Sequence, residues 1–318
     1  MNSDKIKGIL IGVALGDALG APHEFKYQDN IYTGELIYEV KLFNRFHGET
    51  LFNIGSVTDD TQMTLTLANQ IIKDNINSTS SIYNKNNVIL AYEEWATTGK
   101  MLGKNTRALF KNVKTVKGYE NRYNKIFTTT PKEEWTQSNG SLMRCTPLIV
   151  YPDFNPLIID TSLTNPHPIN KDCSIIYTYI LKLLAVGKQL PLIDDLIRYT
   201  KEKAIIDAIL DVKHKILRNI SDKNVKGWVV TALYCALYSI YNIQSINEAF
   251  KLFIEMKGDT DTNAAILGAL YGAKLGFIQL NEDPVNNKNI QILLSNNNIL
   301  NNIDDISNNL FKIYSNGY

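Results

Sequence analysis

The chain has 318 residues, of which 44% are hydrophobic and 20% charged, and its formal net charge at pH 7 is +1. This is enough for a full hydrophobic core in one large domain or in two. The near-neutral balance gives no electrostatic reason to expect binding of nucleic acid or of an anionic membrane. The three cysteines, Cys145, Cys173 and Cys235, form no metal-ligand pattern, and their odd number argues against a disulfide framework.

The first predicted helix covers residues 6–19, and a glycine recurs at every fourth position along it and directly after it: Gly8, Gly12, Gly16 and Gly20. Glycine costs about 1 kcal/mol at each interior helical position. Its repeated use on one face therefore predicts very close approach of another backbone or of a ligand. Lys5 and Lys7 before an apolar run resemble a secretory signal, but Asp17 and the ordered glycines argue against one. No run reaches the ~20 apolar residues of a membrane span, so we expect a soluble cytoplasmic protein.

Helical periodicity also dominates the rest of the chain. In chain order it predicts helices at residues 61–73, 88–95, 172–186, one or two within 192–217, then 225–241, 246–256 and 264–275. The last of these repeats the glycine spacing at Gly268, Gly272 and Gly276. The Asn-rich tail keeps apolar periodicity at residues 290–294 and 303–313, so we expect it to be folded.

Strand signals are scarce. Residues 31–40 are consistent with a hairpin or a loop, and the proline-rich residues 147–168 predict a connecting loop. No Gly/Ser linker or abrupt change of composition divides the chain. The economical interpretation is a single all-α domain spanning residues 1–318.

Two similar clusters of Asp and Thr each precede a predicted helix. The first comprises Thr58, Asp59, Asp60 and Thr61, and the second comprises Asp259, Thr260, Asp261 and Thr262. Either cluster alone is consistent with ordinary helix capping. Together they contain more carboxylates than capping requires, and a metal would remove the repulsion between them. Oxygen donors without His or Cys favour hard cations, so we expect two Mg²⁺ ions, with Mn²⁺ or Ca²⁺ as alternatives.

A carboxylate follows the glycine-rich helix. The glycines are expected to end that helix and Pro22 to turn the chain, which places Glu24 on a loop. Glu24 is there either a general acid or base or a solvated side chain.

Residues 138–144 read SNGSLMR, a stretch that could offer backbone N–H groups and Arg144 to phosphate oxygens, or form an ordinary turn. His167 lies in a Pro-rich stretch and is as consistent with a structural role as with a catalytic one. The chain lacks GxSxG and GxxxxGK[ST], and no cysteine has a plausible His partner. The chain therefore lacks the residues needed for acyl transfer and for P-loop nucleotide hydrolysis.

Six segments in this order resemble the ADP-ribosylglycohydrolases: GDALGAPHEF, GSVTDDTQM, SNGSLMR, SLTNPHP, GWVVTALYCALY and KGDTDTNAAILGALYGAKLG. The resemblance covers about residues 7–276. It implies an orthogonal multi-helix bundle with a binuclear Mg²⁺ centre. The implied metal ligands are Thr58, Asp59, Asp60, Asp259, Asp261 and Thr262. Glu24 matches a catalytic carboxylate of the family, with the metal-held Asp60 as the alternative.

The resemblance also implies the substrate-binding residues. A loop that holds ADP-ribose corresponds to Asn139, Gly140, Ser141 and Met143, and a G-x-x-T loop facing the distal ribose contains Gly103 and Thr106. Asn165 stands where many relatives have His on the adenosine side.

Two departures from the family pattern concern the same regions. Lys257 replaces the first glycine of the usual GGDTDT, which changes a loop rather than a ligand. Met101 stands where arginine-directed members often carry aspartate, which weakens the case for arginine as the linked residue.

The resulting hypothesis is a metal-dependent hydrolase that cleaves the glycosidic bond at the distal ribose of ADP-ribose attached to a protein side chain. The 2″ and 3″ hydroxyls would lie on the two metals, and the transition state would be oxocarbenium-like. Two alternatives stay open: hydrolysis of a small ester such as O-acetyl-ADP-ribose, and a non-catalytic, crystallin-like ADP-ribose-binding protein. We expect a monomer whose partner is an ADP-ribosylated protein or small molecule, without nucleic acid or membrane.

Overall fold

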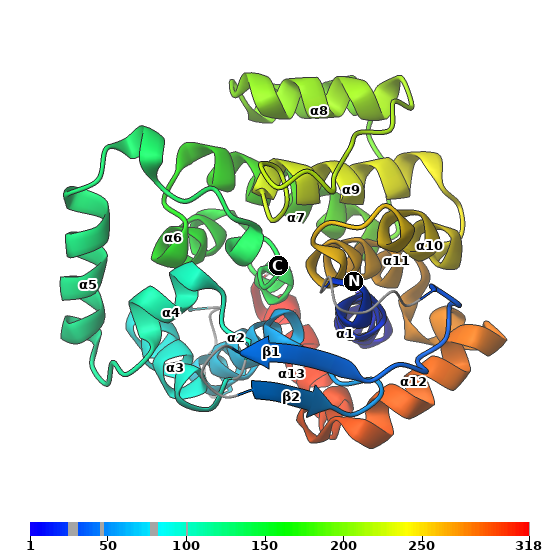
Figure 1. Cartoon of the computed structure of the whole chain (residues 1–318), viewed down its shortest axis with the longest axis horizontal. Helices are drawn as coiled ribbons and strands as arrows, with labels where there is room; N and C mark the ends of the chain where they lie inside the picture. The colour runs from blue at the N-terminus through cyan, green and yellow to red at the C-terminus, as the bar shows by residue number, and fades with distance from the viewer. Residues whose placement is uncertain (25–30, 45–47, 77–81, 100, 318) are drawn as a thin grey trace.

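The computed structural model describes residues 1–24, 31–44, 48–76, 82–99 and 101–317. Helices form nearly all of its regular structure (Figure 1), which confirms the all-α prediction. The α-helices are α1 (Ser3–Glu24), α2 (Asp59–Asn75), α3 (Lys85–Thr98), α4 (Lys104–Phe110), α5 (Val116–Thr128), α6 (Asn155–Thr164), α7 (Pro168–Ala185), α8 (Lys203–Lys213), α9 (Val229–Asn242), α10 (Ile246–Glu255), α11 (Thr260–Glu282), α12 (Pro284–Asn296) and α13 (Ile303–Gly317). Short 3-10 turns occur at Lys132–Glu134, Asn139–Ser141, Thr146–Val150, Ile193–Tyr199 and Asn298–Leu300.

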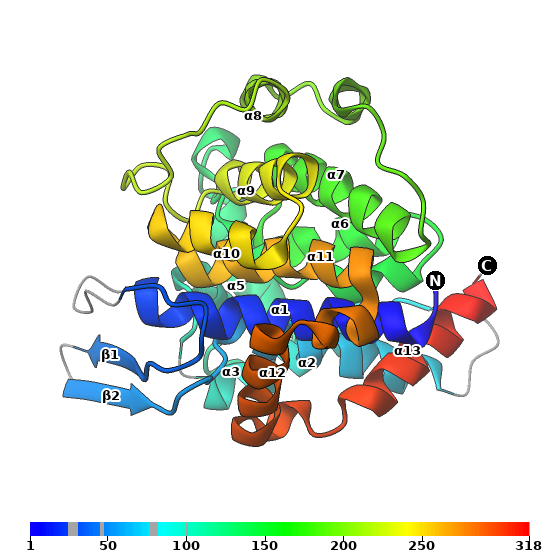
Figure 2. The same ribbon diagram turned by 90° about the vertical axis from the view of Figure 1, so that its right-hand side faces the viewer.

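The central feature of the core is the pairing of α1 with α11, which lie side by side in Figure 2. A Cβ added at any glycine of the α1 repeat would lie within 3.0 Å of the α11 backbone. Gly12 faces Gly268, and Gly8 faces Gly272. The two glycine patterns are therefore the two sides of one helix contact, as the cost of repeated glycine predicted.

α9 is the other deeply buried helix. Its side chains from Val229 to Ile240 are all buried, in agreement with the apolar sequence around the whole helix. The predicted start at residue 225 is four residues too early. The tail is folded as expected, because α12 and α13 both bury apolar side chains. The three cysteines are buried and unpaired.

The predicted loop at residues 147–168 is wrong, because these residues contain a 3-10 turn, α6 and the start of α7. Pro147, Pro156 and Pro168 each stand at the beginning of a helical segment. Proline has no N–H to donate, and the first helical positions have no acceptor for one. These three prolines thus mark helix starts in this region rather than an irregular connection.

The only strands among the described residues are β1 (Val40–Asn44) and β2 (Gly48–Phe52), which pair antiparallel with Val40 opposite Phe52. The hairpin suggested for residues 31–40 therefore lies further along the chain. Leu36 donates its backbone N–H to the Asn289 side chain at 2.9 Å, and Asn289 donates to Gly34 O at 2.8 Å. Partners from α12 thus replace a neighbouring strand in this stretch.

Helices α4 and α5 were not predicted from the sequence. α4 has only seven residues, three of them buried, and is too short for a periodic apolar pattern to be recognised. Within the described part of the chain, no helix has both the length and the apolar composition to cross a membrane.

Candidate functional site

A cleft of about 1110 Å³ opens between the C-terminal end of α1, the N-terminal ends of α2 and α11, and the wall formed by α4. Most of the site residues predicted from the sequence line it: Glu24, Asp59, Asp60, Gly103, Thr106, Asn139, Gly140, Met143, Asn165, Asp259, Asp261 and Thr262. Thr58 and Ser141 are buried behind its wall. The contact between α1 and α11 holds the end of α1 beside the start of α11, where the Thr260 hydroxyl donates a hydrogen bond to Gly20 O at 2.8 Å.

The first Asp/Thr cluster stands at the start of α2. Thr58 is the N-cap, and its hydroxyl accepts a hydrogen bond from Asp60 N at 3.4 Å. The same hydroxyl can donate to Asp60 Oδ2 at 3.1 Å. Asp59 faces the cleft and accepts a hydrogen bond from Gly103 N at 3.3 Å. Thr58 therefore caps the helix, as one interpretation held, while the two aspartates remain available to a ligand.

The second cluster stands at the start of α11 and reaches the first one. Asp259 is the N-cap position but makes no side-chain cap, and instead its Oδ2 accepts a hydrogen bond from Asn139 Nδ2 at 2.8 Å. Asp261 Oδ1 accepts from Thr262 N at 2.8 Å. The Thr262 hydroxyl donates to Asp60 Oδ2 at 3.3 Å. Clusters about 200 residues apart in the sequence are thus joined by a direct hydrogen bond.

Asp17 is a member of the site that the sequence reasoning missed. Its carboxylate is fully buried and accepts hydrogen bonds from Thr58 N at 2.9 Å, from Thr61 N at 3.1 Å and from the Thr61 hydroxyl at 2.6 Å. Burial raises its pKa to about 6. The available signal was a lone carboxylate within an apolar, glycine-rich helix face, where an unpaired charge is costly.

The carboxylates gather in two groups. Oxygen atoms of Asp17, Asp60 and Asp261 lie within 4.8 Å of one another, and so do those of Glu24, Asp259 and Asp261. Burial, together with the neighbouring carboxylates, raises the pKa of Asp60 and of Asp261 well above the usual range. Asp60 Oδ1 is buried and has no hydrogen-bond partner. So many close carboxylates with an orphaned oxygen form a donor set that suits a hard divalent cation.

Glu24 closes α1, contrary to the expectation that it lies on a loop. Pro22 lies inside the last turn of the helix. Proline removes a single N–H, and Gly20 packs closely on Thr260 and Asp261 of α11, which holds this turn in place. Glu24 Oε1 lies 3.3 Å from Lys226 Nζ, a contact that no sequence pattern indicated. Burial, followed by the nearby Asp259 charge, raises the pKa of Glu24 to about 7, and Lys226 opposes the shift.

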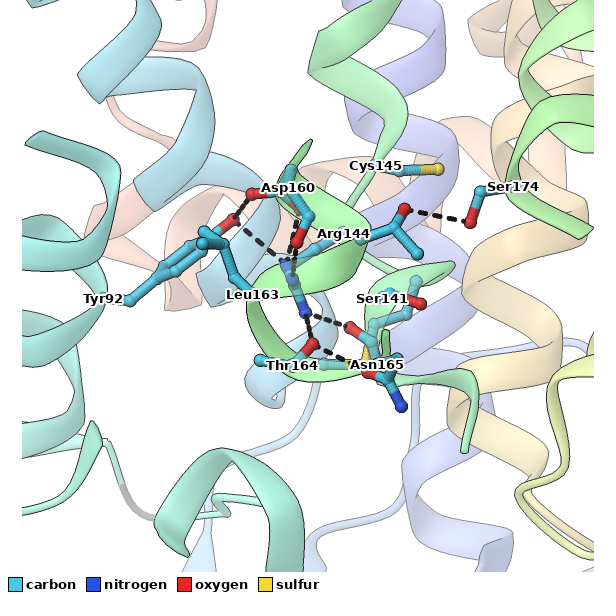
Figure 3. A network of polar contacts seen from close by, with 12 residues as sticks. Tyr92, Ser141, Arg144, Cys145, Asp160, Leu163, Thr164, Asn165 and Ser174 are labelled. Carbon is cyan, nitrogen blue, oxygen red and sulfur yellow. Dashed lines mark hydrogen bonds and ion pairs between the residues drawn. The ribbon is translucent and has the colours of Figure 1, made fainter. Parts of the chain in front are cut away.

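Arg144 does not face the cleft, so the suggested phosphate contact is wrong. Its guanidinium is completely buried and pairs with Asp160 at 3.0 Å (Figure 3). It also donates to Tyr92 Oη at 3.1 Å, to Gly140 O at 2.7 Å and to Thr164 Oγ1 at 2.9 Å. An always-charged guanidinium needs this many partners once it leaves water. Arg144 thus holds the Gly140 loop from behind.

Asn165 and His167 also have structural partners. The Asn165 amide donates to Ser138 O at 3.2 Å and to Ser138 Oγ at 3.1 Å, which ties the loop on the cleft edge. His167 Nδ1 accepts from Ile169 N at 3.1 Å and caps α7, in agreement with its structural interpretation.

Comparison with known proteins finds the same family as the sequence motifs, over most of the chain. A family model described as ADP-ribosylglycohydrolase matches residues 2–299. The chain is 24% identical over 283 residues to the ADP-ribosylarginine hydrolase Tri1 of Pseudomonas putida, covering 86% of this chain and 71% of that protein. It is 24% identical over 285 residues to the ADP-ribosyl-[dinitrogen reductase] glycohydrolase of Rhodospirillum rubrum, covering 86% of each.

A solved structure titled ADP-ribosylglycohydrolase-related protein complex superimposes with a TM-score of 0.67 at 19% identity, covering 98% of both chains, and so shares the fold. The predicted fold and the family resemblance are both confirmed. The chain belongs to the ADP-ribosylglycohydrolase family and is an enzyme, a glycosidase-type hydrolase of ADP-ribosyl linkages.

Proposed function

We propose that this enzyme removes ADP-ribose from a protein side chain by hydrolysing the bond at C1″ of the distal ribose, with two divalent cations as cofactors and Mg²⁺ as the first choice. The observation that carries the proposal is the pair of carboxylate groups that share Asp261. The relatives named above act on ADP-ribosylarginine and on ADP-ribosylated dinitrogen reductase, which supports a protein-linked substrate.

The donor set supports the metals. The residues that would hold them are Asp59, Asp60, Asp259 and Asp261 together with the hydroxyls of Thr58 and Thr262, and Asp17 lies against the same group. Bound cations would supply Lewis-acid stabilisation of the charge that develops as the glycosidic bond lengthens. They would also neutralise carboxylates that otherwise repel one another at 4.8 Å or less.

Glu24 is the residue best placed to move a proton. Its carboxyl lines the cleft, and its pKa near 7 lets it exchange a proton at neutral pH. We assign to it either the positioning and deprotonation of water or the protonation of the leaving group, with Asp60 as the alternative acid or base. Asn139 holds Asp259 and also belongs to the loop that we assign to ADP-ribose binding with Gly140, Ser141 and Met143. We keep Gly103 and Thr106 as contacts of the distal ribose.

The proposal is tested by release of free ADP-ribose from serine-linked and arginine-linked peptides and from O-acetyl-ADP-ribose, with and without EDTA. We expect protein-linked substrates to be hydrolysed and EDTA to abolish release. Release that survives EDTA would remove the metals from the mechanism. Activity confined to O-acetyl-ADP-ribose would replace the proposed substrate with a small ester.

The matched variants are Asp60→Asn with Asp261→Asn, and Asp305→Asn as the control. Asp60 and Asp305 both stand in the first turn of a helix, but Asp305 is exposed on α13. We expect the double variant to lose activity by at least about 100-fold, since each substitution removes an anionic ligand. The control variant should retain the wild-type rate.

A further inference from the structure

Cationic side chains line one wall of the cleft. Lys104, Arg107 and Lys111 on α4 and directly after it all border the cavity. Their spacing of three and then four residues places them on one face of the helix. Glu24 and the aspartates of the two Asp/Thr clusters line the same cleft, so it carries both acidic and basic side chains.

The positive charge continues outside the cleft. Residues 104–125 contain seven Lys or Arg and one Glu, a net charge of +6 in a chain whose total is +1. α5 packs on α4 at the outer edge of the molecule (Figure 1), and Lys114, Lys117 and Lys125 are exposed there. We call the six side chains Lys104, Arg107, Lys111, Lys114, Lys117 and Lys125 the basic rim.

Internal ion pairing leaves most of this charge uncompensated. Among the described residues, the one ion pair of the basic rim joins Lys117 to Glu120 at 3.7 Å. Arg122, the seventh cation, instead donates to Ala108 O and Lys111 O and fastens α5 to α4. A surface patch on which most of the charges are positive and unpaired creates a positive potential. This potential raises the rate at which anionic ligands encounter the patch.

The basic rim begins near the place proposed for the group that is attached to ADP-ribose at C1″. Gly103 N donates to Asp59 Oδ2, so α4 begins directly beside the carboxylates. The ADP part is assigned to the loop that contains Asn139 and Gly140, and the distal ribose to Gly103 and Thr106 at the start of α4, which puts the group attached at C1″ beside the cations of α4. This step rests on the proposed function.

We propose that the basic rim selects ADP-ribosylated protein segments with acidic residues around the linked side chain, and disfavours segments with a linked arginine or basic neighbours. The charge of the rim attracts carboxylates and repels guanidinium groups over about a Debye length, ~8 Å at physiological salt. Met101, which also lines this wall, offers no carboxylate to offset that repulsion.

A protein segment explains the rim better than a nucleic acid does. Single-stranded nucleic acids are held by aromatic side chains that stack on bases as well as by cations. On α5, Tyr119 and Phe127 are buried in the core, and Tyr123 packs against Phe127. The described rim therefore presents charge without an exposed aromatic surface.

The test compares two serine-linked ADP-ribosylated peptides that differ only in having four Glu or four Lys around the linked serine. Binding is measured by fluorescence anisotropy and hydrolysis by release of ADP-ribose, at low and at high salt. We expect the acidic peptide to bind about tenfold more tightly and to show an equally higher kcat/KM with little change in kcat. High salt should reduce the difference.

The diagnostic variant is Lys104→Glu with Lys111→Glu, and the control is Lys188→Glu with Lys201→Glu. Both variants change the net charge equally, but Lys188 and Lys201 are exposed and do not line the cleft. We expect the first variant to lose or reverse the preference and the second to keep it. Free ADP-ribose should bind both variants as it binds the wild type.

Other outcomes overturn the inference. Equal binding of both peptides by the wild type refutes acceptor selection. Weaker binding of free ADP-ribose by the diagnostic variant assigns the cations to the diphosphate instead. Tighter binding of an ADP-ribosylated oligonucleotide than of the acidic peptide assigns the rim to nucleic acid. Preferential binding of the acidic peptide without hydrolysis would refute the proposed function and leave the selection by charge standing.

Discussion

Asp17 accepts hydrogen bonds from both the backbone N–H and the hydroxyl of Thr61, at 3.1 and 2.6 Å. Through this pair the glycine-rich helix α1 fixes the first turn of α2, where Asp59 and Asp60 stand. In Asp17→Asn, one carboxylate oxygen becomes an NH₂ group that cannot accept hydrogen bonds, although three donors point at this side chain. We expect it to lower the free energy of unfolding by about 1–3 kcal/mol, with or without metal, measured by urea denaturation.

Asp261→Asn tests the repulsion between the carboxylates, and its expected effect on stability is opposite to that of Asp17→Asn. Burial and the charges of Glu24, Asp60 and Asp259 raise the pKa of Asp261 well above its usual range, so its ionised form is unfavourable in the metal-free fold. Asparagine keeps an oxygen for Thr262 N. We expect Asp261→Asn to stabilise the metal-free protein at pH 8 and to abolish stabilisation by Mg²⁺. Destabilisation at pH 8 in EDTA would contradict the repulsion between these carboxylates.

The stability of the metal-free protein should depend on pH with a definite sign. Burial raises the pKa of Asp17 to about 6 and, together with nearby charges, that of Glu24 and of Asp59 to about 7, against unfolded values near 4. Between about pH 4 and 7 the folded chain therefore binds more protons than the unfolded chain, and stability falls as pH rises. We expect the Tm in EDTA to be higher at pH 5.5 than at pH 8.

Adding Mg²⁺ should oppose this slope, because metal binding requires deprotonated ligands. At about 100 times Kd, Mg²⁺ should add about 2.7 kcal/mol to the free energy of unfolding at pH 8, and less at pH 5.5. Differential scanning calorimetry with and without EDTA measures both effects. An equal increase in Tm at the two pH values would argue against binding through these carboxylates.

Lys226→Met tests the role of Glu24. Lys226 lies 3.3 Å from Glu24 Oε1 and opposes the rise in the pKa of that carboxyl, so its removal should raise the pKa further. If Glu24 acts as a base, the acidic limb of the kcat/KM profile should move to higher pH, and if it acts as an acid, the alkaline limb should do so. Unchanged limbs in Lys226→Met would assign the proton transfer to another group. Lys226→Arg should preserve the wild-type profile.

Gly12→Ala tests the contact between α1 and α11. In an isolated helix this substitution is favourable by about 1 kcal/mol. Here the added Cβ would overlap the Gly268 carbonyl, so we expect destabilisation of about 3 kcal/mol or more in urea denaturation. Gly103→Ala is the control, because nothing lies within 4 Å of its added Cβ, and the loss of a glycine N-cap should cost at most about 1 kcal/mol.

Local pattern determined much of the fold and the parts of the site. Apolar periodicity predicted the principal helices, since one buried face recurs every three to four residues whatever the partner. The glycine repeats predicted close backbone contact, and two clusters of Asp and Thr predicted an oxygen-rich site. The sequence did not show that Pro22, Pro147, Pro156 and Pro168 belong to helical segments, because the same residue either ends or begins a helix according to the acceptors and packing around it.

Only the tertiary structure decided which groups meet. Asp60 and Thr262 are 202 positions apart and share a hydrogen bond because α1, paired with α11 and bonded to α2 through Asp17, brings both helix starts together. It also decided that Arg144 is a buried support and that Lys226 faces Glu24. These are long-range contacts, set by the packing of whole helices, and no local spacing encodes them. Most of the side chains that line the cleft could thus be named from the sequence, while Asp17 and the surroundings that shift the pKa values of the carboxylates and orient them could not.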